Sequence, residues 1–362
     1  MRQIITVGLA RRSYQILLGK NVLSDLPNLI KNTAIGEDAC VVTTAKIQAL
    51  HGKKLKAALS KACVSVLVLT IPDSEKSKNA GLALRLIEKI TRFDKKKKLF
   101  LVAFGGGVVG DLTGFIAAIY KRGVPYIQIP TTLLAQIDSS IGGKTAIDTS
   151  YGKNLVGAFY QPRFIVSDIN LLKSLPCGQL LAGLSEAVKY ALIKDAGLYA
   201  FLKKYHQKIL KKDTRALSFL IARCAAIKAK VVAKDEFDKT GIRMILNFGH
   251  TFAHAIEAAS RFKTSHGEAV SLGMVCACRL SEKLGLLNYK TSSEAIGLIK
   301  KMGMPTVIKR IRAGAIVKAL AYDKKFAGKT NRFVLLEKIG KTKIVENIPQ
   351  YLVSEVINET LK

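Results

Sequence analysis

Five short β-branched runs, separated by helical stretches, constrain the fold of this 362-residue chain more than any other feature. The runs are Ala39–Thr43, Val64–Leu69, Leu99–Phe104, Tyr126–Ile129 and Phe164–Asp168. Helical patterns such as Asn79–Phe93 lie between them. This alternation predicts an α/β N-terminal domain with a mostly parallel sheet. We expect that domain to cover residues 1–175.

Long amphipathic patterns replace the alternation in residues 176–362. They lie at Gln179–Ile193, Ala216–Ala233, His250–Ala259 and Ala269–Lys283, and a short β-like pair follows at Arg332–Glu337 and Lys343–Glu346. Apolar residues that recur at helical spacing over such lengths predict amphipathic helices. We therefore expect a second, mainly α-helical C-terminal domain.

A glycine-rich turn, Phe104-Gly-Gly-Gly-Val-Val-Gly-Asp111, joins the run Leu99–Phe104 to the helical stretch Leu112–Tyr120. Glycines at such a junction let the backbone approach a phosphate, which the amides at a helix N-terminus then bind. A standard Rossmann unit carries an acidic residue about 20 positions later. Here the next acidic residue is Asp138. The turn therefore indicates a Rossmann-like dinucleotide site outside the standard unit.

Three of the five histidines fall between residues 250 and 266. His250 and His254 are four residues apart and share one face of a predicted helix. Such a pair, with His266 nearby, is typical of a site for a divalent metal of the zinc type. Gly249 and Gly267 flank the group and leave its backbone open. No HExxH motif is present, so a zincin protease is not supported.

Several basic and amide side chains lie among glycines, threonines and other small residues, where solvated surface lysines are unusual. They are Lys144, Lys153, Asn154, Arg243, Asn247 and Lys325. Glu186 and Lys189 are three residues apart on an amphipathic helix, and either a surface salt bridge or a role in the site explains that pair. Together these features predict a metal-assisted redox or elimination enzyme that acts on a phosphorylated acid.

The charge balance of 58 Lys and Arg against 26 Asp and Glu gives a net charge of +32. Such a charge favours anionic partners, including nucleic acid. However, the lysines are spread along the whole chain, and the densest run, Lys95–Lys98, falls in a predicted loop. The chain also lacks the paired Cys and His residues or aromatic strands of nucleic-acid modules. We therefore expect no specific nucleic-acid partner, and the competing hypothesis of a nucleic-acid-binding protein rests on charge alone.

Cysteine usage and hydropathy together predict a cytoplasmic protein with no membrane partner. The six cysteines are scattered without a CxxC pair, and Cys276 and Cys278 lie in the apolar run Ala269–Leu280, which suits buried thiols better than zinc ligands. The first residues do not sustain the apolar stretch of a signal peptide. No window reaches the ~18 uninterrupted apolar residues of a membrane helix.

Successive motifs of the chain resemble the signatures of the 3-dehydroquinate synthase family, in the family order. They are GGGVVGDLTGFIAAIYKRGVPYIQIPTTLLAQIDSSIGGKTAID, YGKNLVGAFYQP, LSEAVKYALI, LNFGHTFAHAIE and HGEAVSLGM. The resemblance runs from about Pro72 to Gly340. It implies a carbon–oxygen lyase of the shikimate pathway, which leads to chorismate and the aromatic amino acids. The implied substrate is 3-deoxy-D-arabino-heptulosonate 7-phosphate, and the implied steps are transient oxidation by NAD, β-elimination of phosphate, re-reduction and ring closure.

The resemblance also implies roles for individual residues. It implies a zinc or cobalt site made by Glu186, His250 and His266, with His254 beside it in a proton relay. It implies an NAD site made by Glu75, Lys78, Gly105, Gly106, Gly107, Gly110, Asp111, Thr131, Thr132, Lys144, Lys153 and Ser174. The substrate would be surrounded by Asp138, Lys144, Asn154, Lys189, Lys228, Arg243, Asn247 and Lys325. Arg122 matches a position that reaches into the neighbouring subunit's site, which implies a homodimer.

Two other enzyme classes remain open. Another sugar-phosphate cyclase, such as a 2-deoxy-scyllo-inosose synthase, would act on a substrate without a carboxylate. The residues Lys228, Arg243 and Lys325 argue against it, because a carboxylate together with a phosphate needs several cationic donors. A metal-dependent polyol dehydrogenase would release NADH and would need no phosphate pocket.

Overall fold

The computed structural model describes residues 2–62, 64–94, 98–322 and 331–362, and Lys95–Lys97 therefore lie outside the described residues. The chain forms two compact units. Unit 1 comprises Met1–Pro176 and Leu217–Phe237, and unit 2 comprises Cys177–Ala216 and Asp238–Lys362. The segment Leu217–Phe237 therefore belongs to unit 1, whereas we expected all of residues 176–362 to form the second domain.

Unit 1 is built on a seven-stranded sheet in the order β1-β2-β9-β6-β5-β3-β4. Its strands are β1 (Arg2–Val7), β2 (Tyr14–Gly19), β3 (Asp38–Thr44), β4 (Ser65–Ile71), β5 (Leu99–Gly105), β6 (Tyr126–Pro130) and β9 (Phe164–Asp168). Only β1 is antiparallel to its neighbour, and the other pairs are parallel. The five strands predicted from β-branched runs, and the mostly parallel sheet, are confirmed.

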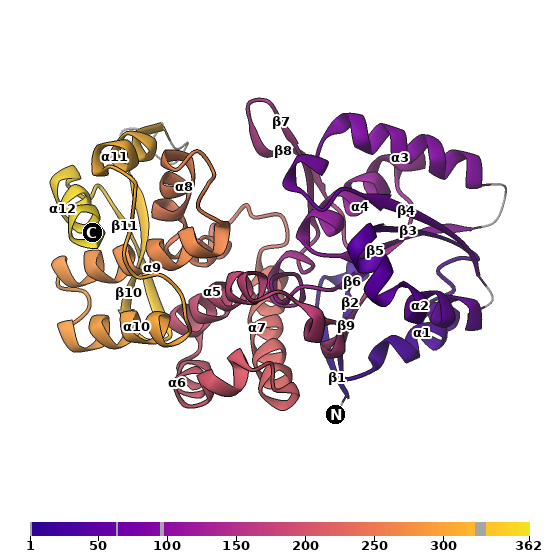
Figure 1. The fold of residues 1–362 in the computed structure, drawn as a ribbon, viewed down its shortest axis with the longest axis horizontal. Coiled ribbons are helices and arrows are strands. Elements are labelled where there is room, and N and C mark those ends of the chain that lie inside the picture. The colour runs from indigo at the N-terminus through magenta and orange to yellow at the C-terminus, as the bar shows by residue number, and fades with distance from the viewer. Residues whose placement is uncertain (1, 63, 95–97, 323–330) are drawn as a thin grey trace. The chain divides into compact units, whose positions relative to one another are not determined.

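Helices cover both faces of this sheet, as the full burial of β3, β5, β6 and β9 requires. Helices α1 (Leu26–Thr33) and α2 (Ala45–Lys61) pack on one face, and α3 (Ala80–Phe93) and α4 (Gly107–Ile119) pack on the other (Figure 1). The side chains of Thr44 and Asn79 cap α2 and α3 by accepting hydrogen bonds from the amides of Ile47 and Leu82.

Helix α4 starts at Gly107, inside the glycine motif and five residues before the predicted start at Leu112. Glycine disfavours a helix by about 1 kcal/mol relative to alanine, which is why the pattern predicted a turn here. Packing overrides that preference, because a Cβ at Gly110 would lie 2.8 Å from the Gln128 side chain on β6. The glycine motif is therefore partly turn and partly helix.

The predicted helix at Ala216–Ala233 is confirmed, but its place in unit 1 was not predicted, and neither were strands β1 and β2 or a hairpin. The strands β7 (Lys144–Thr149) and β8 (Gly152–Phe159) form an antiparallel hairpin. The helix α7 (Thr214–Lys234) returns to the sheet edge, where Ala225, Ala229 and Val232 join a cluster with residues of β1, β2 and β9. These contacts explain why the segment Leu217–Phe237 belongs to unit 1.

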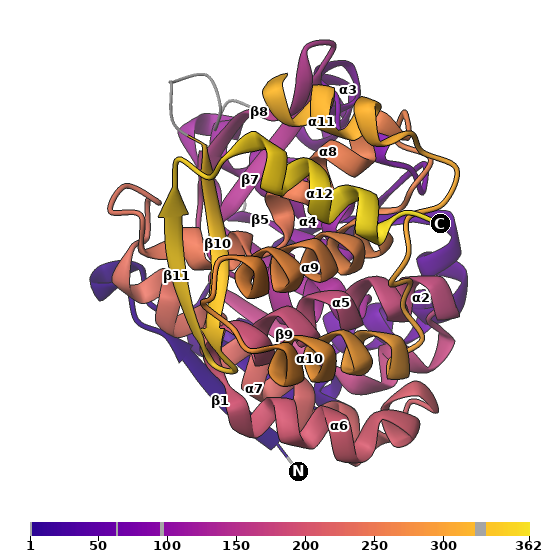
Figure 2. The same ribbon diagram turned by 90° about the vertical axis from the view of Figure 1, so that its left-hand side faces the viewer.

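Unit 2 is mainly helical, as predicted from the amphipathic patterns, and its elements are arranged around α9. Figure 2 shows α9 among α5, α8, α10, α12 and the hairpin β10–β11. The elements are α5 (Cys177–Lys194), α6 (Ala196–Leu210), α8 (His250–Ala259), α9 (His266–Lys283), α10 (Tyr289–Lys301), α11 (Ala313–Tyr322), β10 (Arg332–Lys338), β11 (Lys341–Glu346) and α12 (Gln350–Thr360).

The thiols of Cys276 and Cys278 are buried on α9, which confirms that reading of the CxC pair. Burial raises the pKa of Cys276 to about 11 and that of Cys278 to about 12, so both stay protonated at neutral pH. Among the described residues, no helix has both the length and the apolar character that crossing a membrane requires.

Candidate functional site

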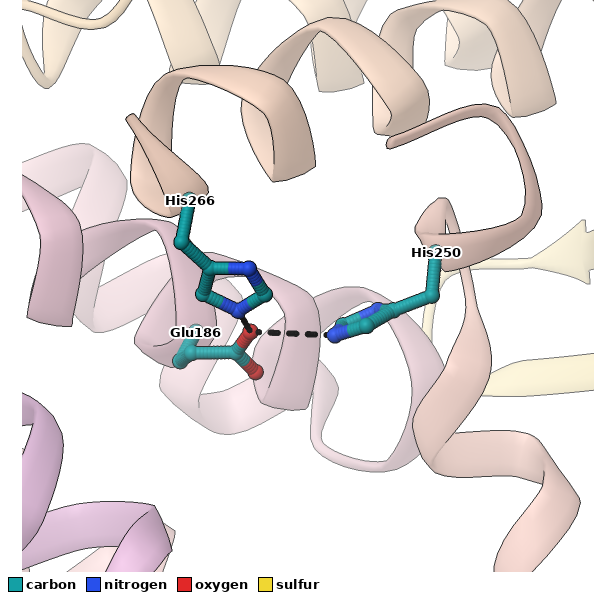
Figure 3. A group of neighbouring side chains, drawn as sticks. All are labelled: Glu186, His250 and His266. Atoms are coloured by element: carbon teal, nitrogen blue, oxygen red, sulfur yellow. Dashed lines mark ion pairs between the residues drawn. The ribbon is translucent and has the colours of Figure 1, made fainter. Parts of the chain in front are cut away.

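Glu186, His250 and His266 converge within unit 2, although they come from three separate helices (Figure 3). Glu186 lies in the middle of α5, whereas His250 and His266 are the first residues of α8 and α9. The Nε2 atoms of His250 and His266 lie 3.4 and 3.7 Å from Oε1 of Glu186. One ligand atom from each side chain falls within 4.8 Å of the others, so the three could hold one metal ion.

The electrostatics of this group suit a cation site. Burial alone would raise the pKa of Glu186, which is 1% exposed, but Lys189, His250 and His266 hold it well below the usual range. Burial and Lys189 lower the pKa of His250 to about 3, so its imidazole is neutral. Burial also opposes the charged form of His266, yet Glu186 and Glu257 raise its pKa to about 10. A carboxylate and two imidazoles are the donor set that zinc and cobalt prefer.

Glycines bring the three helices close enough to form this group. A Cβ at Gly267, next to His266, would lie 2.4 Å from the Cα of Ala182 on α5. A Cβ at Gly273 on α9 would lie 2.1 Å from the carbonyl oxygen of Gly249, which itself adopts φ +77°. These glycines therefore serve close helix packing, rather than the open backbone expected from the sequence.

The two histidines are each oriented through the second ring nitrogen. Nδ1 of His250 lies 3.3 Å from the backbone carbonyl oxygen of Phe248. Nδ1 of His266 lies 3.5 Å from Oε1 of Glu257 on α8. Sequence reasoning did not single out Glu257, although its spacing of seven residues from His250 places it on the same helix face.

Other predicted residues of unit 2 lie on α5 and α8 or in a segment that contacts α5. Lys189 is 3% exposed and contacts Oε2 of Glu186, so the pair is a buried ion pair and the surface alternative is wrong. The ring centroid of His254 lies 5.7 Å from that of His250, and His254 also lines a hollow of about 470 Å³ between α8 and α11. Arg243 is buried and Asn247 half-buried in the 3₁₀ segment Ile242–Asn247, which contacts α5. The predicted residue Lys325 lies outside the described residues.

In unit 1, the glycine loop, which is the part of the glycine motif at Gly105–Gly107, lies against the turn that follows β6. The amide of Thr131 donates to the carbonyl oxygen of Gly105 over 2.9 Å. A Cβ at Gly106 would lie 3.1 Å from the side chain of Thr132, and Thr132 in turn accepts a hydrogen bond from the amide of Ala135. These hydrogen bonds fix the turn beside the N-terminus of α4. The backbone amides at a helix N-terminus can bind phosphate groups.

Lys78 links several of the predicted cofactor residues. Its side chain is 3% exposed, and Nζ lies 2.7 Å from Oδ2 of Asp111, 3.6 Å from Oε1 of Glu75 and within hydrogen-bonding distance of Oδ1 of Asn154. Burial raises the pKa of Asp111 to about 6, although Lys78 acts in the opposite direction. Asp148, which sequence reasoning missed, accepts a hydrogen bond from the amide of Asn154 over 2.8 Å.

Further predicted residues occupy separate parts of unit 1. Asp138, in the π-helical turn Ala135–Ser139, forms an ion pair with Lys228 on α7. Nζ of Lys144 lies 5.8 Å from the ring centroid of Phe159, within cation–π range. Lys153 is exposed on β8, and Arg122 is exposed with φ +63° at the end of the segment Tyr120–Arg122.

Ser174, the last predicted cofactor residue, has a buried histidine as its partner. Its hydroxyl lies 2.8 Å from Nε2 of His51 on α2 and donates to the carbonyl oxygen of Leu171 over 3.3 Å. Sequence reasoning did not single out His51, because a lone histidine more than a hundred residues away carries no local signal.

Known proteins resemble this chain over nearly its whole length. The family 3-dehydroquinate synthase N-terminal matches residues 68–182, and 3-dehydroquinate synthase C-terminal matches residues 183–326. The 3-dehydroquinate synthase of Dehalococcoides mccartyi strain CBDB1 is 40% identical over 355 residues, which cover 98% of this chain and 99% of the relative. That of Caulobacter vibrioides is 41% identical over 357 residues and 96% of each chain.

Solved structures share the fold. A 2-deoxy-scyllo-inosose synthase complexed with carbaglucose-6-phosphate, NAD⁺ and Co²⁺ superimposes with a TM-score of 0.89 at 26% identity. The match covers 99% of this chain and 100% of that one. Since the two halves of one family match in chain order and the relatives align almost from end to end, this chain belongs to the 3-dehydroquinate synthase family.

Proposed function

We propose that this enzyme converts 3-deoxy-D-arabino-heptulosonate 7-phosphate to 3-dehydroquinate and inorganic phosphate, with NAD and a divalent metal as cofactors. Full-length identity of about 40% to 3-dehydroquinate synthases supports this assignment more than the 26% identity to the inosose synthase supports another. The single structural observation that carries it is the convergence of Glu186, His250 and His266 from three helices.

The proposed metal ligands are Glu186, His250 and His266, and the ion would be zinc or cobalt. When bound, the metal would polarise a hydroxyl oxygen of the substrate, and NAD would take up and return a hydride. The three residues would hold the ion with one protein donor fewer than a structural zinc site uses, as in catalytic zinc sites. His254 lies beside the group and can move a proton at its imidazole nitrogens.

NAD is proposed to bind at the N-terminus of α4, with its phosphates on the glycine loop. A Cβ at Gly105 would lie 2.5 Å from the side chain of Val109, so the loop needs glycine there, and backbone amides at a helix N-terminus suit phosphate binding. The buried ammonium of Lys78 adds positive charge beside the loop. Ser174 and Lys153 remain proposed cofactor contacts.

The substrate carries a carboxylate and a phosphate, and the proposed recognition relies on lysine and arginine. Arg243 is the proposed carboxylate ligand, because a planar guanidinium binds a carboxylate through two parallel hydrogen bonds. Its side chain is only 5% exposed, so the contact would form in a poorly solvated place. The other proposed substrate contacts are Asp138, Lys144, Asn154, Lys189, Lys228, Asn247 and Lys325.

The proposed assembly is a homodimer in the cytoplasm. An exposed Arg122 at a left-handed turn is the residue proposed to reach the neighbouring subunit's site. The buried cysteines Cys40, Cys224, Cys276 and Cys278, which form no disulfide among the described residues, support a reducing compartment.

The test is to incubate the purified protein with the heptulosonate phosphate, NAD and Zn²⁺ or Co²⁺, and to measure phosphate and dehydroquinate. Both products should form in equal amounts, should need only trace NAD, and should leave no net NADH absorbance. A chelator should stop the reaction, and added metal should restore it. Failure to form dehydroquinate with metal and NAD bound would overturn the proposal.

The second candidate is another sugar-phosphate cyclase, which the TM-score of 0.89 to the inosose synthase favours. Glucose 6-phosphate, which has no carboxylate, discriminates between the two. Its turnover in place of the heptulosonate phosphate would support the second candidate. Stoichiometric NADH with a polyol would instead indicate a dehydrogenase.

A further inference from the structure

We propose that Glu257 is a positioning residue for metal binding: its carboxylate holds the ring of His266 so that Nε2 faces the ion. The inference rests on the metal site of the proposed function, but it concerns a residue outside the three proposed metal ligands. It follows from the distances around His266 and from the place of Glu257 on α8.

The imidazole of His266 lies between two carboxylates. Its Nε2 is 3.7 Å from Oε1 of Glu186, and its Nδ1 is 3.5 Å from Oε1 of Glu257. Glu186 is the carboxylate that the three-residue group shares, so the Nε2 side of the ring is the side that meets the ion. In the neutral ring that metal binding requires, a hydrogen on Nδ1 directed at Glu257 selects the tautomer in which Nε2 has a free lone pair.

His250 shows the same arrangement with a different acceptor. Its Nε2 lies 3.4 Å from Oε1 of Glu186, while its Nδ1 lies 3.3 Å from the carbonyl oxygen of Phe248. Both histidines thus present Nε2 to Glu186 and direct Nδ1 at an oxygen. The acceptor for His250 is backbone and cannot be removed by substitution, whereas the acceptor for His266 is a side chain.

Glu257 is held firmly enough to orient a ring. Its side chain is 10% exposed, against 40% for His266, so the carboxylate is the more buried of the two partners. Its backbone carbonyl oxygen accepts hydrogen bonds from the hydroxyl of Ser260 and the amide of Phe262, both over 2.8 Å, which fix the end of α8. The close approach of Gly249 to Gly273 holds α8 against α9, so the Glu257–His266 distance is set by packed backbone.

Removal of this acceptor should weaken metal binding without unfolding the protein. His266 would lose the contact that selects its tautomer and ring orientation, and substitutions of such partners weaken metal affinity by roughly 10–100-fold. Glu257→Gln keeps an oxygen acceptor but removes the charge, so it should fall between the wild type and Glu257→Leu, which removes both.

The experiment titrates the purified, metal-free full-length protein with Co²⁺ alone and follows its visible absorption, with Zn²⁺ competition to obtain affinities. Glu268→Gln is the matched control. Glu268 lies on the first turn of α9, two residues from His266, and glutamine can replace glutamate in the capping box that it forms with Ser265. The control therefore loses the same charge near the same histidine but keeps the helix start.

The expected order of affinity is wild type and Glu268→Gln together, then Glu257→Gln, then Glu257→Leu, with the last at least tenfold weaker. Wild-type affinity in a folded Glu257→Leu protein would overturn the proposal. If that variant does not fold, equal affinities for Glu257→Gln and Glu268→Gln would overturn it. Because no NAD or substrate is present, these results are separate from the assay for dehydroquinate, and either proposal can fail alone.

Discussion

In unit 2, some residues are proposed metal ligands and others are proposed to act on the substrate. His250 and His266 converge on Glu186, whereas His254, only one turn along α8, faces a hollow towards α11. Arg243 is buried in a segment that contacts α5 and lies seven residues before His250. Substitutions at these positions should therefore have different effects.

Replacement of His254 by alanine should leave metal binding intact and slow turnover. We expect a loss of roughly 10²–10⁴-fold in kcat, which is typical for a general acid or base, because the ring stands beside the metal group and is not one of its donors. His250→Ala should instead lose the metal. Metal content and kcat measured on the same preparations separate the two, with His206→Ala on α6 as the control. Loss of metal from the His254 variant would place that ring among the ligands.

Replacement of Arg243 by lysine should damage turnover of the heptulosonate phosphate. A lysine keeps the charge but cannot bind a carboxylate through a planar fork. The lost contact corresponds to ~1.5–3 kcal/mol, or at least tenfold in kcat/KM. The affinities for NAD and Zn²⁺ should stay near wild type, and Arg332→Lys, at an exposed position of β10, should leave turnover unchanged. An unchanged kcat/KM would exclude Arg243 as the carboxylate ligand.

At the scale of elements, the metal group depends on how closely α5, α8 and α9 pack. The two closest backbone approaches, at Gly267 against Ala182 and at Gly273 against Gly249, leave no room for a side chain. Each of these contacts lies within two helical turns of a proposed metal ligand, His250 or His266. Small increases in the spacing of these helices should therefore lower both the free energy of unfolding and the metal affinity.

Gly267→Ala should destabilise the protein and weaken metal binding. Its methyl group would lie 2.4 Å from the Cα of Ala182, so α5 and α9 must separate, at a cost of about 1–3 kcal/mol. Gly297→Ala on α10 is the control, because its methyl group would meet nothing within 4 Å and alanine favours a helix. Thermal unfolding and Co²⁺ titration of both variants test the expectation. Similar behaviour of the two would mean that the helices can adjust.

Whole elements were predictable from sequence to different extents, for physical reasons. Strands such as β5 are buried on both faces and read as continuous apolar runs, so they were found. Strand β1 mostly alternates exposed and half-buried positions, and strand β8 is largely exposed, so neither gave a hydrophobic signal. Helix α4 was placed too late, because contacts with β6 decide where its glycines lie.

The candidate site was predictable only in part. The spacing of His250 and His254 and the nearby His266 indicated a metal, but the spacing of Glu186 and Lys189 could equally have meant a surface ion pair. Only family resemblance gave Glu186 its role, since its partners come from other helices. Long-range partners, such as Glu257 for His266, depend on packing that no local pattern records.

At the scale of the whole molecule, an ion pair between Arg12 and Glu236 helps to link the later segment of unit 1 to its start. Glu236, just after α7, accepts two hydrogen bonds from the guanidinium of Arg12, at 2.9 and 2.7 Å, and one from Gln161. The hydrogen bond from Arg12 holds the pKa of Glu236 below its ordinary value. The pair is partly solvated, so its contribution to stability should be modest.

Glu236→Gln should lower the free energy of unfolding at pH 7 but not in acid. A carboxylate whose pKa is lower in the folded state stabilises the fold above its unfolded pKa, about 4.3, and loses that effect as the pH falls through the folded value. The difference between wild type and variant should therefore shrink below about pH 4. Urea unfolding at a series of pH values measures it. A difference that stays constant with pH would mean that the amide substitution acts through packing.

The return of α7 to unit 1 also bears on how the chain is made. A ribosome delivers the amino end first, and domains generally fold as units in that order. Unit 1 stays incomplete until residue 237 has emerged, and by then α5 and α6 of unit 2 have already been released. The apolar surface around Val7, Ile16 and Ile165 has no cover from α7 during that interval. Nascent chains that end before residue 217 should therefore attract chaperones, and chains that extend past 237 should be released from them.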